Sequence, residues 1–233
     1  MIFDLINDVW KANMELFNSG LVIQTWGNVS GINRTEGLIA IKPSGMHYSK
    51  LNVNDIVVVD LEGKVVKGDK KPSSDTAAHV ELYKAFPEIG GISHTHSIYA
   101  TVFSQACREI PCLGTTHADN FYGSIPVTRF LTEKEIETGY ERNTGTVIIE
   151  RFGKLDYVRT PGVLVAGHAP FCWGRNPADA VTNSIVLENI AQMALLTMRL
   201  NPEVEEIPKY ISQKHFQRKH GPNSYYGQKK EGE

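Results

Sequence analysis

Two histidines, His94 and His96, stand one residue apart in the stretch SHTHS. Positions i and i+2 point about 200° apart on a helix, so they cannot share a ligand there. On a strand the same positions lie on one face, roughly 6.6–7 Å apart. Two imidazoles can then bind one ion at about 2.0–2.1 Å per bond. The segment 89–93 is strand-like and Ser97 can begin a helix, so we expect the pair at the carboxyl end of a strand.

A third histidine is needed to make this pair a metal site, because a lone H-x-H pair is more often a surface or core feature. His168 follows an apolar run at 163–167 and is the strongest candidate. Three histidines leave one coordination position open, as in catalytic zinc sites. The alternative for His168 is a strand-end histidine that satisfies a local hydrogen bond. The competing histidines are His47, His79, His117, His215 and His220.

Three of these other histidines have two possible roles each. His79 lies four residues after Asp75 in a predicted helix, so it either supports the site or packs in the core. His215 and His220 fall in a basic helix and are either solvated or directed at substrate.

Three turns rich in small polar residues could bind a phosphate group. The turn KKPSSD (70–75) precedes a predicted helix, whose free N–H groups and serine hydroxyls can hold an anion. The other two are KPSG (42–45) and WGNVS (26–30). Each alone is an ordinary cap or turn, but together they supply serines, an asparagine and a lysine. Arg218 and Lys219 in the last predicted helix can add positive charge.

Two further segments carry groups that could move protons. Asp119 ends the loop TTHAD (115–119), either as a proton carrier or as a turn residue. Tyr225 and Tyr226 stand in a polar C-terminal tail. They either dock on a neighbouring subunit and bring a phenol to its site, or only pack there.

The composition argues against several classes of protein. The 233 residues are 41% hydrophobic and 21% charged, as in globular proteins, and the net charge of −2 gives no support for nucleic-acid or membrane partners. No apolar run reaches 18 residues and no basic segment opens the chain, so neither a transmembrane helix nor a signal peptide is predicted. Free thiols in a reducing cytosol are expected for the cysteines, Cys107, Cys112 and Cys172.

The elements that position these groups follow from periodicity and turn residues. Helices are predicted at 2–17, 74–86, 97–106, 176–200 and 208–221, and a capping box at Thr132 opens a short one. Strands are predicted at 37–41, 56–60, 64–67, 89–93, 146–152 and 163–167. Strict alternation is absent, so we expect one α/β domain over 1–233, with a mainly antiparallel central sheet flanked by helices and a polar tail from about residue 222.

Together these motifs resemble the class II aldolase/epimerase family, from the first helix to Gln228. The resemblance implies a three-layer α/β/α fold. Any one of the motifs is weak, but this many in one order is specific. They are TWGNVS (25–30), IKPSG (41–45), KKPSSDT (70–76), SHTHS (93–97), GTTHAD (114–119), FYG (121–123), WGRN (173–176), and RKHG with YYGQ within 218–228.

The resemblance also implies a site. One divalent metal per subunit, normally Zn²⁺, would be held by His94, His96 and His168, with Asp75 beside it. Asp119 and Tyr226 match the acid–base pair of the epimerases. Contacts to a sugar-phosphate substrate are implied for Gly27, Asn28, Lys42, Ser44, Gly45, Ser73, Ser74, Thr115, Glu141 and Arg218.

The implied reaction is epimerisation of a ketopentose 5-phosphate at C4, as in arabinose catabolism, by retro-aldol cleavage and re-addition with the metal as Lewis acid. Related fuculose-phosphate and rhamnulose-phosphate aldolases have Glu where this chain has Asp75. A cytoplasmic homotetramer with active sites between adjacent subunits is implied. The alternatives are a class II aldolase and a non-catalytic sugar-phosphate binding protein. Ala169 stands where relatives often have Gly, so this position must have an ordinary backbone.

Overall fold

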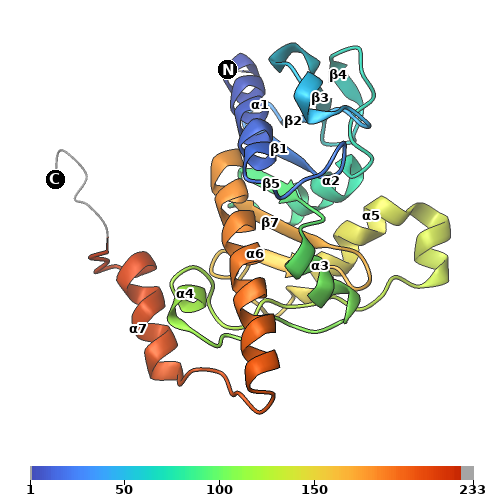
Figure 1. Ribbon diagram of the computed structural model, residues 1–233. Helices are drawn as coiled ribbons and strands as arrows, with labels where there is room; N and C mark the ends of the chain where they lie inside the picture. Colours follow the sequence, from blue (N-terminus) through green and yellow to red (C-terminus); the bar gives the residue numbers. More distant parts are fainter. Residues whose placement is uncertain (1, 227–233) are drawn as a thin grey trace.

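The computed structural model describes residues 2–226, in which seven strands form one sheet (Figure 1). The strand order is β4-β3-β2-β1-β5-β7-β6, and every neighbouring pair is antiparallel. The strands are β1 (Asn28–Asn33), β2 (Leu38–Ile41), β3 (Val57–Asp60), β4 (Val65–Lys67), β5 (Gly91–His94), β6 (Gly162–Leu164) and β7 (Pro170–Gly174).

Helices cover both faces of this sheet, which confirms the three-layer prediction (Figure 1). Successive strand residues point to opposite faces. Ile39 packs on the side of α2 and α5, whereas its neighbour Ala40 packs on the side of α1. The helices are α1 (Ile2–Asn18), α2 (Thr76–Ala85), α3 (Ile98–Gln105), α4 (Thr115–Ala118), α5 (Glu133–Arg151), α6 (Pro177–Leu200) and α7 (Lys209–His220), with short 3₁₀ turns η1 (Tyr48–Lys50) and η2 (Val53–Asp55).

Two facing glycines let α6 begin directly on the sheet. Gly31 of β1 and Gly91 of β5 are register partners. A Cβ at Gly91 would lie 2.4 Å from the Asn176 carbonyl, and one at Gly31 would lie 2.7 Å from Pro177 Cγ. Asn176 caps the helix as predicted, because its side chain accepts from Asp179 N at 2.8 Å. Because neither glycine has a side chain, the start of α6 packs closely against the strand that carries His94.

The predicted strand at 146–152 is wrong, because this segment is the second half of α5. Its β-branched residues suggested a strand, but Thr144, Val147 and Ile148 are buried at helical spacing. Ile148 packs into the cluster that also holds α2 and the sheet. Tertiary packing thus overrides the local β propensity. The capping box at Thr132 is confirmed, but the helix that it opens is long and breaks only at Gly139 (φ 145°).

Other boundaries also differ from the predictions. The stretch 26–30, interpreted as a turn, enters the central strand β1, and neither β7 nor α4 was predicted. The strand expected to reach Gly167 ends at Leu164, and Gly167 takes the positive φ of +68° in the turn that follows. Ala169 is not among the residues with positive φ, as expected.

The C-terminal region leaves the sheet altogether. Helix α7 (red in Figure 1) lies beside the short helix α4 and away from the strands. The tail predicted from about 222 is described only to Tyr226, and the predicted motif residue Gln228 lies outside the described residues. Among residues 2–226, no helix combines the length and the apolar character needed to cross a lipid bilayer. Cys107 is exposed and the other two cysteines are buried, all three as free thiols.

Candidate metal centre and active site

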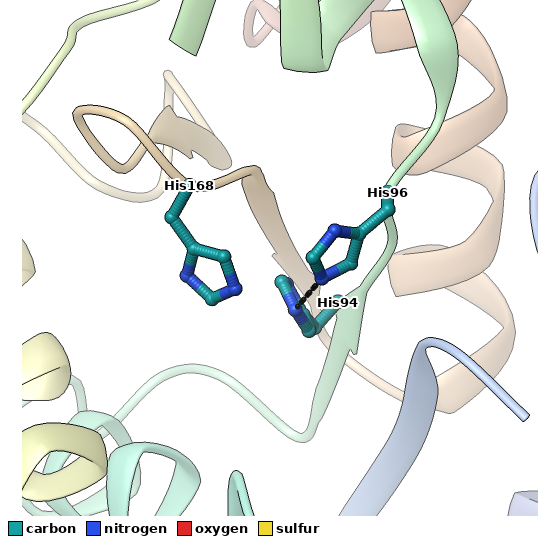
Figure 2. A group of neighbouring side chains, drawn as sticks. All are labelled: His94, His96 and His168. Carbon is teal, nitrogen blue, oxygen red and sulfur yellow. Dashed lines mark hydrogen bonds between the residues drawn. The ribbon is translucent and has the colours of Figure 1, made fainter. Parts of the chain in front are cut away.

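Three histidine rings meet at one end of the sheet (Figure 2). His94 is the last residue of β5, as predicted, and His96 follows in the loop before α3. His168 comes from the turn between β6 and β7. The ring centroids are 4.9–5.0 Å apart in all three pairings. Each ring offers one nitrogen as a possible metal ligand, and these three nitrogens all lie within 4.8 Å of one another.

The spacing of these atoms fits a divalent metal ion. His94 Nε2 and His96 Nε2 are 3.2 Å apart. Two nitrogens bound at about 2.0–2.1 Å to one tetrahedral zinc ion would be about 3.3 Å apart. His94 Nδ1 lies 2.9 Å from Pro170 O, so this backbone carbonyl fixes the tautomer that leaves Nε2 free as a ligand. His168 Nδ1 is buried without a hydrogen-bond partner. The three side chains therefore form an open donor set that fits a divalent metal ion.

The electrostatics keep these rings in the state that binds metal. Burial and, to a smaller extent, the neighbouring imidazoles together lower the pKa of His96 and of His168 to about 4. Asp75 opposes this effect by raising both pKa values. Both rings are therefore neutral at pH 7 and have free nitrogen lone pairs to offer a metal.

Asp75 lies beside the histidine cluster, and a hydrogen bond from Asn28 of β1 fixes its carboxylate. Asn28 Nδ2 donates to Asp75 Oδ2 at 2.7 Å and to Ser73 Oγ at 3.1 Å. Burial raises the pKa of the Asp75 carboxyl, but His94, His79 and the Asn28 hydrogen bond outweigh it, so the pKa lies below its ordinary value. Asp75 is not within the group of three close ligand atoms. Its part in metal binding remains a prediction.

The predicted phosphate turns lie next to each other. Ser44 N donates to Lys71 O at 2.9 Å, and Ser73 N donates to Lys42 O at 3.1 Å, so the turns at 42–45 and 70–74 are joined by backbone hydrogen bonds. Asn28 connects the second turn to β1 through Ser73. Gly45, at the exposed end of the first turn, takes a positive φ of +64°. A Cβ added at this position would have no other atom within 4 Å. The three turns therefore lie next to one another, and their binding of one phosphate stays a prediction.

Two residues of these turns lie unusually close to the site. A Cβ at Gly27 would be 2.8 Å from His94 O, and its φ of +76° also favours glycine. Lys42 is only 2% exposed, and its Nζ donates to Thr25 O at 3.1 Å. Burial lowers the pKa of Lys42 to about 8, while the Asp75 carboxylate raises it. A buried ammonium group beside two serine turns suits an anionic ligand.

Asp119 belongs to a second cluster, formed by α4 and α7. Arg218 donates to both carboxylate oxygens, from Nε at 2.9 Å and from Nη2 at 2.6 Å, and His215 Nδ1 lies 3.0 Å from Oδ1. His220 Nε2 donates to Asp119 O at 2.9 Å. Burial raises the pKa of Asp119, but Arg218 and His215 outweigh it and lower the pKa. His215 therefore lies against a candidate catalytic carboxylate, which its basic helix alone did not reveal.

Tyr226 joins the same cluster. Its ring centroid lies 4.8 Å from the Arg218 guanidinium and 4.7 Å from Lys219 Nζ, and its backbone N donates to Arg218 O at 3.2 Å. Arg218 thus contacts both predicted proton carriers. Thr115 begins α4 and shares this region. Among the contacts of residues 2–226, none joins this cluster to the three histidines.

Tyr140 lies near the histidines but was not among the candidate site residues predicted from the sequence. Tyr140 follows the break in α5 at Gly139, and its ring centroid is 6.2 Å from that of His168. Burial raises the pKa of Tyr140, and the Asp75 and Glu141 carboxylates raise it further. The predicted residue Glu141 therefore lies on the helix that borders the histidine cluster. The helix break that orients Tyr140 carried no sequence signal beyond Gly139 itself.

Comparison with known proteins identifies the fold and the family. Residues 7–195 match the model of the class II aldolase and adducin N-terminal domain. An L-fuculose 1-phosphate aldolase has 26% sequence identity and a TM-score of 0.77, over 92% of this chain and 95% of that one. An L-fuculose-1-phosphate aldolase from Thermus thermophilus has the same fold, at 22% identity and a TM-score of 0.68, over 88% of this chain and 100% of that one.

Proposed function

Because the chain belongs to the class II aldolase and adducin N-terminal domain family, we propose that it is a metal-dependent epimerase. It would interconvert L-ribulose 5-phosphate and D-xylulose 5-phosphate at C4 and would serve pentose catabolism. The observation that carries the proposal is the pair Asp119 and Tyr226, gathered around Arg218 and apart from the histidines. Inversion at C4 needs a proton carrier on each face of the substrate, and these two side chains supply them.

The histidine cluster would bind the reacting end of the substrate. His94, His96 and His168 would hold one Zn²⁺ or another divalent ion, which when bound supplies Lewis-acid polarisation of the ketose carbonyl. Asp75, anchored by Asn28, would add negative charge beside this position. All four groups lie at the end of the sheet where β1 begins and β5 ends.

The joined turns would bind the phosphate. Ser44, Gly45, Ser73 and Ser74 would present hydroxyl and N–H donors, as turns that precede a helix commonly do for anions. Gly27 and Asn28 would line the same pocket beside His94. Lys42 would supply a buried positive charge. A phosphate anchored here stays in place when the C3–C4 bond breaks, so the two-carbon aldehyde can rotate without leaving.

The proton transfers would then be made by the second cluster. One of Asp119 and Tyr226 would take the C4 hydroxyl proton, and the other would return a proton to the C4 oxygen after the aldehyde has rotated. Within the described chain these residues make no contact with the histidines, so we assign them to the site of an adjacent subunit in a homotetramer. Thr115, Glu141 and Arg218 would line that composite site.

An aldolase is the second candidate, favoured by the likeness to the L-fuculose 1-phosphate aldolase. Such enzymes use a glutamate as base after the paired serines, where this chain has the shorter Asp75. The Asp75 carboxylate is held by Asn28 at 2.7 Å, which favours a supporting rather than a proton-transferring role.

Incubation of the chelated and then zinc-restored protein with L-ribulose 5-phosphate tests the proposal. Zinc-dependent formation of D-xylulose 5-phosphate, with little free glycolaldehyde phosphate, is the expected result. Accumulation of glycolaldehyde phosphate and dihydroxyacetone would identify an aldolase instead. Tight binding of the sugar phosphate without turnover would show that the protein binds sugar phosphates but is not an enzyme for them.

A further inference from the structure

A line of buried polar side chains runs behind the histidine cluster, and the proposed reaction does not use it. Ser30 of β1 contacts two residues of α2. Its Oγ is 2.7 Å from His79 Nδ1 and 2.8 Å from Tyr83 Oη. Ser30 and His79 are completely buried, and Tyr83 is 1% exposed. The far nitrogen of the His79 ring, Nε2, has no hydrogen-bond partner.

The direction of these hydrogen bonds can be assigned by counting donors and acceptors. The Tyr83 phenol proton needs an acceptor, and Ser30 Oγ, 2.8 Å away, provides one. Ser30 then donates to His79 Nδ1. The opposite direction would leave both the Tyr83 proton and the His79 Nε2 lone pair unsatisfied. This direction places the His79 proton on Nε2, the ring nitrogen that has no partner.

Asp75 lies one helical turn before His79 and is the nearest candidate acceptor along α2. The backbone N of His79 donates to Asp75 O at 3.1 Å. Positions 75 and 79 are four residues apart, so their side chains lie on the same face at the start of α2. Burial lowers the pKa of His79 to about 3, and the Asp75 carboxylate opposes this effect. A buried N–H without an acceptor is unfavourable, and Asp75 is the nearby anion.

Asp75 also has capacity for another donor. Asn28 Nδ2 occupies Oδ2, and a carboxylate accepts about four hydrogen bonds. We propose that His79 is a positioning residue for Asp75, and that its Nε2–H donates to the carboxylate when Asp75 turns toward a divalent metal held by the three histidines. This inference rests on the metal site of the proposed function but not on the substrate.

A matched pair of substitutions tests the role of Nε2. Glutamine can place an amide nitrogen near the position of His79 Nε2, whereas asparagine reaches only the position of Nδ1. We expect His79→Asn to weaken zinc binding about tenfold or more, measured by competition with a chromophoric chelator, and His79→Gln to stay within about threefold of the wild type. Equal affinities of the two variants, high or low, would reduce His79 to a packing residue and overturn the inference.

Two measurements keep the test decisive even if a variant folds poorly. ¹⁵N NMR of the wild-type protein should show His79 protonated at Nε2, and a proton on Nδ1 would refute the inference. In an Asp75→Ala background, His79→Asn should cost no further zinc affinity, because the acceptor of the Nε2 proton is already absent. Additive losses would show that His79 does not act through Asp75. Wild type that binds zinc but does not turn over a pentulose phosphate would refute only the proposed epimerase.

Discussion

Arg218 holds both carboxylate oxygens of Asp119, with Nε 2.9 Å from Oδ1 and Nη2 2.6 Å from Oδ2. Such bidentate pairs fix the orientation of a carboxylate as well as its charge. The same guanidinium lies over the ring of Tyr226. One arginine therefore orders both candidate proton carriers on an arm of the molecule that lies outside the sheet.

Asp119→Asn should separate proton transfer from metal binding. The amide has nearly the shape of the carboxylate but cannot accept the proton, so turnover should fall at least about 100-fold. Zinc content should be unchanged, because none of the contacts of Asp119 involves the histidine cluster. Epimerase assays and elemental analysis on the same preparation check both statements. Activity within tenfold of the wild type would remove Asp119 from the mechanism.

His96→Ala should abolish stoichiometric zinc binding. The substitution removes the nitrogen that lies 3.2 Å from His94 Nε2 and leaves two ligands, too few for a stable site. His47→Ala is the matched control, because His47 contacts Ser49 at η1 and is not in the cluster. Elemental analysis after dialysis should find zinc in the control only. Equal zinc in the two proteins would reject the ligand assignment.

Truncation after Ser224 should abolish turnover and leave the metal in place. It removes Tyr226, whose ring packs on Arg218 and Lys219, but none of the three histidines. The measurement is the epimerase rate together with zinc content. Tyr226→Phe serves as the control for the phenol, because it keeps the ring contact and removes the hydroxyl. Full activity of the truncated protein would show that the tail has no part in the reaction.

The buried His117 should make stability depend on pH. Burial lowers its pKa to about 4, although its hydrogen bond to Gly123 O at 2.8 Å raises the pKa. Between pH 6.5 and about 4 the unfolded chain therefore binds a proton at this position that the folded protein does not. Stability is unaffected above pH 6.5 and falls as the pH drops through this window.

His117→Gln isolates this contribution, because glutamine can keep the donor to Gly123 O and cannot titrate. From pH 7.5 to 4.5, urea unfolding should show wild type losing stability relative to the variant. The slope should approach about 1.4 kcal/mol per pH unit within the window. Parallel pH profiles of the two proteins would contradict the buried, neutral state of His117.

Gly91→Ala should destabilise the protein by at least about 2 kcal/mol in urea unfolding, since overpacking at a rigid contact commonly costs this much. Its Cβ would lie 2.4 Å from the backbone at Asn176 and Pro177. Gly114→Ala is the control, because no atom lies within 4 Å of its Cβ, and a change within about 0.5 kcal/mol is expected. A neutral Gly91→Ala would mean that α6 does not rest on the sheet here.

The sequence by itself determined the residue types of the site and the class of fold. H-x-H spacing after a strand, a distant third histidine and the serine turns are local patterns, and short-range geometry is enough to interpret them. The capping box at Thr132 and the Asn176-Pro177 helix start were predicted for the same reason, since a cap depends on residues only three positions apart.

Only the tertiary structure decided which of these groups meet. The segment 146–152 has the propensity of a strand, yet packing of Ile148 against α2 makes it a helix. Asp119 and Tyr226 are 107 positions apart in the chain, and no local rule links them; α7 brings them together through Arg218. Long-range contacts of this kind depend on where whole helices dock, a property of the packed core rather than of any short stretch of sequence.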